Sequence, residues 1–303
     1  MIKYLSILYF LFSFDAFSQN VKVSSGSIET IPAFESKYLD ARQVDVWLPD
    51  GYSNQEKYSV LYMHDGKMLF DADITWNKKS WELDEVAGKL IQENKIKKCI
   101  VVGIHNNGEY RHSEYFPEKM IQNIPEAARK IIVEESLKNK PQADNYLKFI
   151  VSELKPFIDK KYATLNDQEN TFMAGASMGG LISLYAICEY PNIFGAVAGI
   201  STHSPMISKI DFRFDVDKDI ASKFRDYLNL NLPNPENHKI YMDYGDQSID
   251  AYYKPFQEKI DVILKEKGYT DKNWVTRFFP GENHSETSWN KRLDIPLIFL
   301  LEN

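Results

Sequence analysis

The chain has 303 residues, 44% of them hydrophobic and 26% charged, and its formal net charge at pH 7 is −7. This length and hydrophobicity suit one large α/β core, and no linker-like stretch interrupts it, which predicts a single domain over residues 19–303. Because nucleic-acid binding depends on clustered Lys and Arg side chains that neutralise phosphates, the acidic balance argues against a nucleic-acid partner.

The first residues have the pattern of a secretory signal peptide. Lys3 precedes an apolar run from Tyr4 to Phe14, and the segment Ala16-Phe17-Ser18 follows it. A charged start, a short hydrophobic middle and small residues at the cleavage site define such peptides. The run is short for a bilayer span, which leaves a membrane anchor as the less favoured alternative. We expect residues 1–18 to be removed, and the mature chain to be secreted or periplasmic without a transmembrane helix.

Strands and helices are predicted to alternate along the rest of the chain. Residues 42–48 alternate apolar and polar side chains, as in a half-exposed edge strand, whereas 58–63 and 99–104 are dense apolar runs suited to interior strands. The other predicted elements are a helix that Ser80 caps, a helix over about 144–162, a strand over 171–174, a helix over 180–190, strands over 194–200 and 239–244, a helix over about 253–267 and a strand over 274–279.

This alternation predicts an α/β fold with a mostly parallel, doubly wound sheet flanked by helices. In such folds, functional sites lie outside the carboxyl ends of the strands. The two cysteines, Cys99 and Cys188, fall on predicted elements and are expected in the core, with their pairing left open by the sequence.

A G-x-S-x-G sequence, Gly175-Ala176-Ser177-Met178-Gly179, joins the strand over 171–174 to the helix that follows it. The flanking glycines let the backbone fold tightly and expose the serine hydroxyl above the sheet, as in the nucleophile elbow of α/β-hydrolases. The alternative is a glycine-rich turn with an incidental serine, which the strand-turn-helix context disfavours. The sequence therefore predicts an α/β-hydrolase fold with Ser177 as its nucleophile.

A serine nucleophile needs a base and an acid, which follow it in the chain order Ser, Asp or Glu, His. His284 lies in the loop after the last predicted strand, which predicts that it is the base. Three carboxylates, Asp243, Asp246 and Asp250, lie at or just after the end of the strand over 239–244. The residues alone leave the acid open among them, because Asp250 is equally suited to cap the following helix.

Several segments along nearly the whole mature chain match one family. They are Val60–Gly66, Val101–Ile104, Arg111 with Glu114–Pro117, Phe149–Asp159, the elbow through Gly180, and Gly281–Glu286 with Trp289. In these segments the chain resembles the Putative esterase (esterase-D-like) family of α/β-hydrolases, which includes S-formylglutathione hydrolases, feruloyl and acetyl-xylan esterases, trilactone-siderophore esterases and mycolyl transferases. Family members read roughly Gly-Thr-x-x-Leu-Asp after the seventh strand. Alignment on Gly245 implies Asp250 as the acid, with Asp246 as its rival.

The chemistry expected of these residues is acyl transfer through an acyl-enzyme on Ser177. The backbone amides of Met178 and Lys67 are the expected oxyanion donors, the second from the loop after strand 58–63. Arg111 is a candidate for a substrate carboxylate, against the alternative that it pairs with Glu114.

Tyr115 and His64 are further candidates for substrate binding, against plain loop packing. Scattered His and Cys predict no metal site, and no cofactor is expected. The predicted function is a serine carboxylic-ester hydrolase acting on small-molecule or carbohydrate esters, such as acylated sugars, aryl esters or siderophores. An acyltransferase on the same scaffold is the alternative, and a non-catalytic binding protein is a third possibility that the complete triad disfavours.

Overall fold

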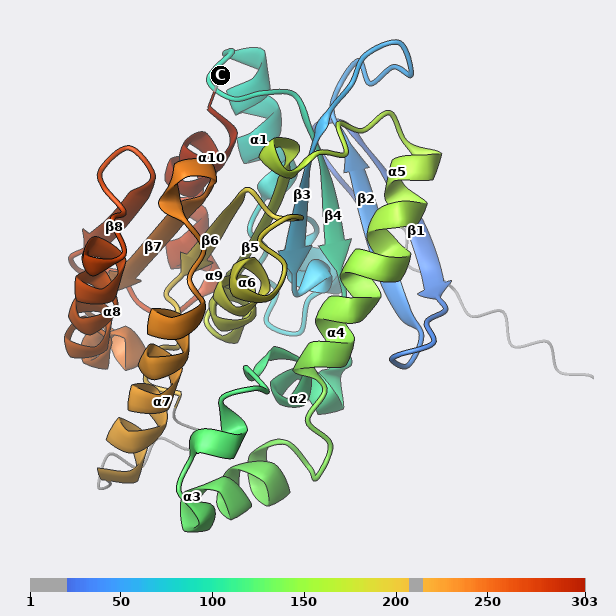
Figure 1. Cartoon of the computed structure of the whole chain (residues 1–303). Coiled ribbons are helices and arrows are strands. Elements are labelled where there is room, and N and C mark those ends of the chain that lie inside the picture. The colour runs from blue at the N-terminus through green and yellow to red at the C-terminus, as the bar shows by residue number, and fades with distance from the viewer. Residues whose placement is uncertain (1–20, 207–214, 303) are drawn as a thin grey trace, which may run out of the picture.

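The protein is described by a computed structural model that covers residues 21–206 and 215–302, so the predicted signal peptide over 1–18 lies outside the described residues. An eight-stranded sheet crosses the molecule, with helices against both of its faces (Figure 1). The strand order is β1-β2-β4-β3-β5-β6-β7-β8. The strands are β1 Ser27–Phe34, β2 Arg42–Leu48, β3 Ser59–His64, β4 Cys99–Ile104, β5 Thr171–Ala176, β6 Ala196–Ile200, β7 Lys239–Gly245 and β8 Trp274–Phe279.

Only the first two strands run against their neighbours. β1 pairs with β2 and β2 pairs with β4 in antiparallel register, whereas the pairs from β4 to β8 are all parallel. Parallel strands need crossover connections, which place helices on both faces and bury the strands between them. Accordingly β3, β4, β5 and β6 are buried along their whole length. Their carboxyl ends meet at one edge of the sheet.

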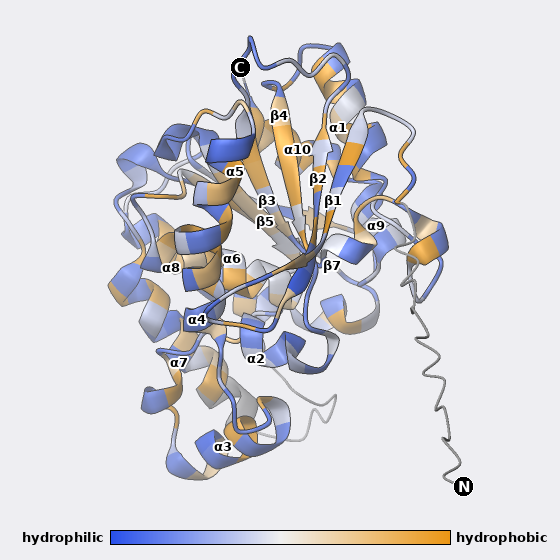
Figure 2. Cartoon of the chain, turned by 90° about the vertical axis from the view of Figure 1, so that its right-hand side faces the viewer, coloured by the Kyte–Doolittle hydropathy of each residue, from blue (hydrophilic) through white to orange (hydrophobic). Residues whose placement is uncertain are grey.

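Two hydrophobic layers lie on opposite faces of this sheet, and the apolar strands run between them (Figure 2). The larger layer includes Ile158, Leu181 and Phe224, and the smaller one includes Leu90 and Leu300. The helices of the larger layer are α2 Arg111–Tyr115, α3 Glu126–Ile131, α4 Ala143–Phe149, α5 Lys155–Lys161, α6 Met178–Glu189, α7 Asp215–Asn231 and α8 Lys254–Glu266, and those of the smaller one are α1 Leu83–Gln92, α9 Glu286–Asn290 and α10 Asp294–Leu301. The predicted doubly wound, mostly parallel sheet is confirmed.

Some local predictions differ from the structure. The strand expected at a half-exposed edge, over 42–48, is β2, which is mostly buried because β1 pairs with its outer side. Ser80 does not cap a helix: α1 begins after Glu82, which adopts a left-handed φ of 49°. The reason is tertiary, because the amides of Trp81 and Leu83 donate to the carbonyls of Met68 and Leu69, each at 3.0 Å, and fix this segment against the loop after β3. The predicted helix over 144–162 is divided into α4 and α5 by a π-helical turn over Ile150–Leu154.

Both cysteines are buried and unpaired. Cys99 packs in the smaller hydrophobic layer and Cys188 in the larger one, on opposite faces of the sheet. Burial raises the pKa of the Cys99 thiol to about 12 and raises that of Cys188 as well.

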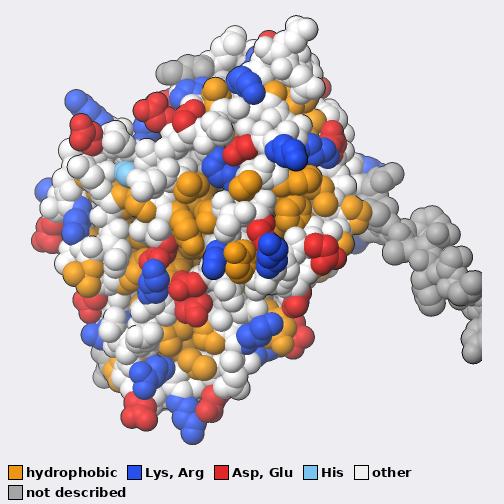
Figure 3. Space-filling model, turned by 45° about the vertical axis from the view of Figure 1, so that its right-hand side comes forward, with side chains coloured by type: hydrophobic (Ala, Val, Ile, Leu, Met, Phe, Trp, Pro, Cys, Tyr) orange, Lys and Arg blue, Asp and Glu red, His pale blue; other side chains and the backbone are white. Residues whose placement is uncertain are grey.

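The surface in Figure 3 shows hydrophobic side chains in separate groups among charged and polar ones. Across residues 21–206 and 215–302, no helix has the length and apolar character that a membrane crossing requires.

Candidate active site

Ser177 lies in the turn between β5 and α6 with a backbone φ of 58° and ψ of −120°. A non-glycine residue in this region is strained and persists only where its surroundings hold it. Here the Ser177 amide donates to the carbonyl of Ile200 at 2.9 Å, and its carbonyl accepts from the amide of His203 at 3.1 Å. A Cβ atom on Gly175 would lie 2.8 Å from the backbone of Gly179, so the tight turn requires glycine there.

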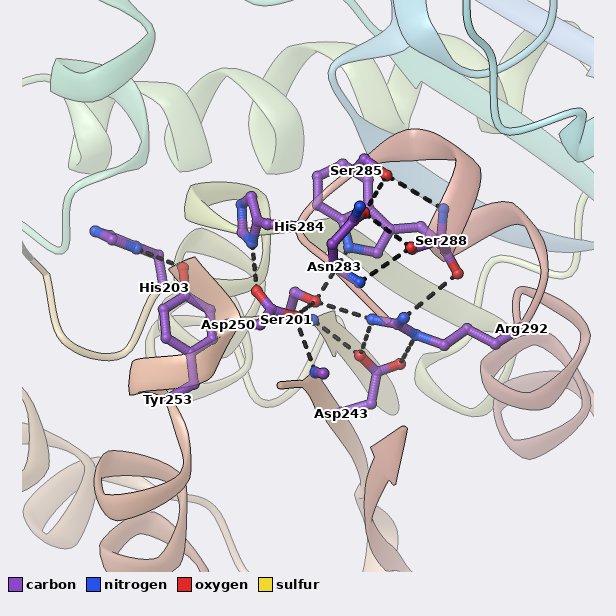
Figure 4. Close-up of polar contacts among 12 residues, drawn as sticks. Ser201, His203, Asp243, Asp250, Tyr253, Asn283, His284, Ser285, Ser288 and Arg292 are labelled. Carbon is purple, nitrogen blue, oxygen red and sulfur yellow. Dashed lines mark hydrogen bonds and ion pairs between the residues drawn. The ribbon is translucent and has the colours of Figure 1, made fainter. Parts of the chain in front are cut away.

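His284 and Asp250 form a hydrogen-bonded pair (Figure 4). His284 lies in the turn between β8 and α9, and its Nδ1 is 2.6 Å from Oδ1 of Asp250. Asp250 is completely buried in the 3-10 turn Ser248–Tyr252 after β7. Although burial alone would raise it, the hydrogen bonds from His284, Ser201 and the Gly245 amide hold the pKa of Asp250 below its ordinary value.

The other two carboxylates after β7 have different partners. Asp246 accepts from the amide of Gly281 at 2.8 Å and from the Gln247 side chain at 2.9 Å. Asp243 is buried in an ion pair with Arg292, with 3.0 Å between NH2 and Oδ1. Of the three, the structure brings Asp250 to His284.

Two aromatic rings hold the His284 imidazole from its sides. Trp289 and Tyr253 both meet it edge to face, with ring centroids 5.0 Å and 5.8 Å away. The Tyr253 hydroxyl is 2.7 Å from Nδ1 of His203 and also interacts with the Ser177 side chain. Burial raises the pKa of Tyr253 and the contact with Ser177 opposes that rise. Tyr253 therefore contacts the side chains of both Ser177 and His284.

Ser177 and His284 open into one pocket of about 620 Å³. Its lining includes Lys67 from the loop after β3 and Arg111 from the loop region after β4. Aromatic side chains also line it, from Trp76, Trp81 and Trp289. The arrangement joins a half-buried serine, an imidazole tied to a buried carboxylate, and a partly aromatic wall at the carboxyl ends of the strands.

A protein-family model described as Putative esterase matches residues 36–298. The chain belongs to this esterase family. The protein is accordingly an esterase, an enzyme that hydrolyses carboxylic esters.

Solved structures and curated relatives are similar to this esterase. A ferulic acid esterase superposes with a TM-score of 0.65 at 19% identity, over 91% of this chain and 97% of its own. The enterobactin esterase FES from Shigella flexneri also has a TM-score of 0.65, at 17% identity, over 92% of this chain and 60% of its own. These likenesses confirm the predicted α/β-hydrolase fold. An endo-1,4-beta-xylanase/feruloyl esterase of Xylanibacter ruminicola is 27% identical over 195 residues, which are 60% of this chain and 22% of that relative.

The two residues predicted to donate to the oxyanion come from different segments of this esterase. Met178 is the first residue of α6, where the amide has no acceptor within the helix. Lys67 lies in the 3-10 turn Gly66–Met68, which begins after Asp65 in a left-handed conformation with φ of 58°. Lys67 lines the pocket that Ser177 also lines.

Arg111 reaches the pocket, but its charge is paired with a residue that the sequence reasoning did not choose. Its Nε and NH2 groups donate to the two carboxylate oxygens of Asp65, each at 2.7 Å. Although burial opposes the shift, the Arg111 guanidinium holds the pKa of Asp65 below its ordinary value. Glu114 forms a buried pair with Arg42 instead, at 2.7 Å.

Tyr115 and His64 lie beneath the pocket surface rather than on it. Tyr115 is fully buried and its hydroxyl accepts from the Asp65 amide at 3.2 Å. His64 is 2% exposed, with Nδ1 2.8 Å from the Tyr146 hydroxyl, and burial lowers its pKa to about 3. Its ring touches the position that a Cβ of Gly175 would take, so it supports the elbow from below.

The sequence reasoning missed several residues that surround the triad candidates. Tyr253 and Ser201 carry no motif, and Trp289 was visible only as a family match. Trp76 precedes a short polar stretch, Asn77–Ser80, and belongs to no periodic pattern. Within the described ranges, no group of three or more His, Cys, Asp or Glu side chains is arranged to hold a metal ion.

Proposed function

We propose that this esterase hydrolyses its substrates through an acyl-enzyme on Ser177, with His284 as the base and Asp250 as the acid that orients it. The observation that carries the proposal is the 2.6 Å contact between His284 Nδ1 and Asp250 Oδ1 in the pocket that Ser177 also lines. A carboxylate at Nδ1 fixes the tautomer in which Nε2 is free to accept the serine proton. In this mechanism the Ser177 hydroxyl, on the strained elbow turn, gives its proton to that nitrogen.

The proposed reaction has two steps, acylation of Ser177 and hydrolysis of the acyl-enzyme. Ser177 Oγ attacks the ester carbonyl while its proton passes to His284, and the amides of Met178 and Lys67 stabilise the oxyanion. The C–O bond to the alcohol breaks as His284 returns the proton to the leaving oxygen. A water molecule then attacks the acyl-enzyme while one of its protons passes to His284. The bond from the acyl carbon to Ser177 Oγ breaks as His284 returns that proton to Oγ, and the carboxylic acid product is released.

The position of Trp76 indicates which kind of alcohol the substrate ester carries. Its side chain is 82% exposed at the rim of the pocket, and the neighbouring Asn77 donates to Glu286 at 2.9 Å, two residues after His284. Because His284 protonates the leaving alcohol, that half of the ester must lie on its side. An exposed indole face among polar groups suits a ring with an apolar face and hydroxyl edges better than an alkyl chain. This supports acylated carbohydrate or aryl esters as the substrate class.

One similar protein is a ferulic acid esterase, which supports an ester with an aryl group. Another is an enterobactin esterase, which keeps siderophore esters among the candidate substrates. The proposal also includes a mature single domain over 19–303 that is secreted or periplasmic after removal of residues 1–18. The support for that part is the sequence pattern of the leader alone.

The test is an activity panel with active-site labelling. The full chain is assayed on acetylated xylan, feruloylated sugars, a trilactone siderophore and a simple aryl ester, and a fluorophosphonate adduct is located by mass spectrometry. We expect the adduct on Ser177 and a loss of about 10⁶-fold in kcat for Ser177→Ala. Ser152→Ala, which removes an exposed helical serine, is the matched control. An adduct elsewhere, or full activity of Ser177→Ala, would overturn the mechanism. A product that carries the acyl group on an added alcohol would indicate an acyltransferase.

A further inference from the structure

Ser201 is a fully buried serine at the end of β6, next to the proposed triad but outside it. Its backbone φ of 42° lies in the left-handed region, which is uncommon for serine and costs energy unless the surroundings hold it. Its amide donates to Oδ1 of Asp243 at 3.0 Å. A strained, buried polar residue at the carboxyl end of the strand beside β5 suggests a function in the site.

Three side chains surround the Ser201 hydroxyl (Figure 4). Its Oγ lies 2.6 Å from Oδ2 of Asp250, 3.1 Å from Nε1 of Trp289 and 2.9 Å from an NH2 group of Arg292. The indole and the guanidinium can only donate, whereas a hydroxyl has one proton and two lone pairs. Both lone pairs are therefore occupied, and the single proton of Ser201 must point to Asp250.

Other contacts hold the Arg292 guanidinium in the orientation in which it donates to Ser201. Its guanidinium is almost fully buried and pairs with both carboxylate oxygens of Asp243, at 3.0 and 3.3 Å. A further N–H group donates to the carbonyl of Ser288 at 3.3 Å. Because a buried charge pair of this kind has few alternative arrangements, it fixes the donors that face Ser201.

The proton direction also determines what Asp250 can do. Its Oδ2 accepts from Ser201 and from the Gly245 amide at 2.9 Å, so that oxygen cannot carry a proton of its own. Its Oδ1 is then left for His284 Nδ1. Ser201 thus favours the ionised carboxylate and turns it toward His284.

We propose that Ser201, oriented by the Asp243–Arg292 pair and Trp289, is a positioning residue that keeps Asp250 ionised and aligned with His284. This inference rests on the proposed function of Asp250 and His284. It assigns Ser201 no contact with the substrate. The rate of acyl transfer then depends on the Ser201 hydroxyl, which acts through its hydrogen bond to Asp250.

The experiment compares Ser201→Ala with Ser201→Gly. Both variants lack the hydroxyl, but glycine suits the left-handed backbone, so their stabilities should differ while their catalytic defects should agree. We expect kcat to fall by about 10- to 100-fold in both, since a hydrogen bond to a charged group is lost, with KM changed less than about threefold. The acid limb of the pH–rate profile should move to higher pH, because Asp250 without the Ser201 donor binds a proton more readily.

Ser204→Ala is the matched control. Ser204 is also buried, three residues further along, and its hydroxyl has no hydrogen-bond partner among the described residues. Its removal should leave kcat and the pH profile unchanged.

The inference is overturned if either hydroxyl-free variant of Ser201 keeps wild-type kcat, or if the losses follow the melting temperatures with no shift in the acid limb. Failure of the proposed function looks different. In that case the wild type would show no Ser177-dependent hydrolysis at all.

Discussion

Replacement of Asp250 by asparagine should inactivate the enzyme through the tautomer of His284. In the asparagine side chain, the oxygen occupies one of the two positions that Oδ1 and Oδ2 have in Asp250, and the NH₂ group occupies the other. The Oδ2 position receives two donors, the Ser201 hydroxyl at 2.6 Å and the Gly245 amide at 2.9 Å, so the amide oxygen must take it. The NH₂ group then faces Nδ1 of His284 and forces that nitrogen to accept. The proton moves to Nε2, which can no longer take the proton of Ser177.

The size of the effect follows from that wrong tautomer. A comparable Asp-to-Asn change in a serine protease lowers kcat by about 10⁴-fold, which corresponds to about 5 kcal/mol of lost transition-state stabilisation. The fold should survive, because the amide still accepts the two donors on its buried side. Initial rates on an ester that the wild type hydrolyses, together with thermal melts, measure both quantities.

Asp246→Asn is the matched control for Asp250→Asn, because Asp246 lies four residues earlier in the same segment after β7. The Asp246 carboxylate accepts from the amide of Gly281 and from Gln247, and an asparagine oxygen can replace it at the first contact. We expect kcat within about twofold of the wild type. Near-normal turnover of Asp250→Asn, with a collapse of Asp246→Asn in a folded protein, would refute the reasoning.

Three other predictions concern the nucleophile, the elbow and acid stability. Ser177→Ala and His284→Ala should each remove most of kcat, and the double variant should lose little more, because triad members act as a unit; independent, multiplicative losses in steady-state assays would argue against a triad. Gly175→Ala should lower the free energy of unfolding in urea by about 1–3 kcal/mol, because the added Cβ would lie 2.8 Å from the backbone of Gly179; an unchanged unfolding midpoint would contradict this. The folded pKa of Asp65 is depressed, so its ion pair stabilises the fold fully above the ordinary aspartate pKa of about 4 and is lost as the pH falls below it. The stability difference between wild type and Asp65→Asn should therefore shrink from pH 7 to pH 3, and a constant difference would refute this linkage.

Local patterns were sufficient to predict the main strands and the tight turn that carries Ser177. β8 has the predicted bounds, 274–279, and the elbow lies where the glycines placed it. Both depend on periodicity or on backbone freedom within a few residues, which a single sequence records. Ser177 and His284 could be chosen as candidates because each follows a recognisable strand.

Interactions between distant residues could not be predicted in this way. Arg111 was weighed against its neighbour Glu114, yet its partner is Asp65, 46 residues earlier. The contact from Trp289 to Ser201 spans 88 residues. The choice of Asp250 over Asp246 depends on how the turn after β7 folds, which the residues alone left open. β1 escaped prediction because it is an edge strand whose side chains are mostly exposed or half-buried.

The alkylation rates of the two unpaired thiols would report how often the core of the folded protein opens. Only a thiolate reacts with alkylating reagents, and both cysteines are buried with raised pKa values. A reagent can therefore alkylate Cys99 or Cys188 only in molecules in which the hydrophobic layer around that cysteine has opened. Since Cys99 and Cys188 lie on opposite faces of the sheet, their two alkylation rates compare how often each face separates from it.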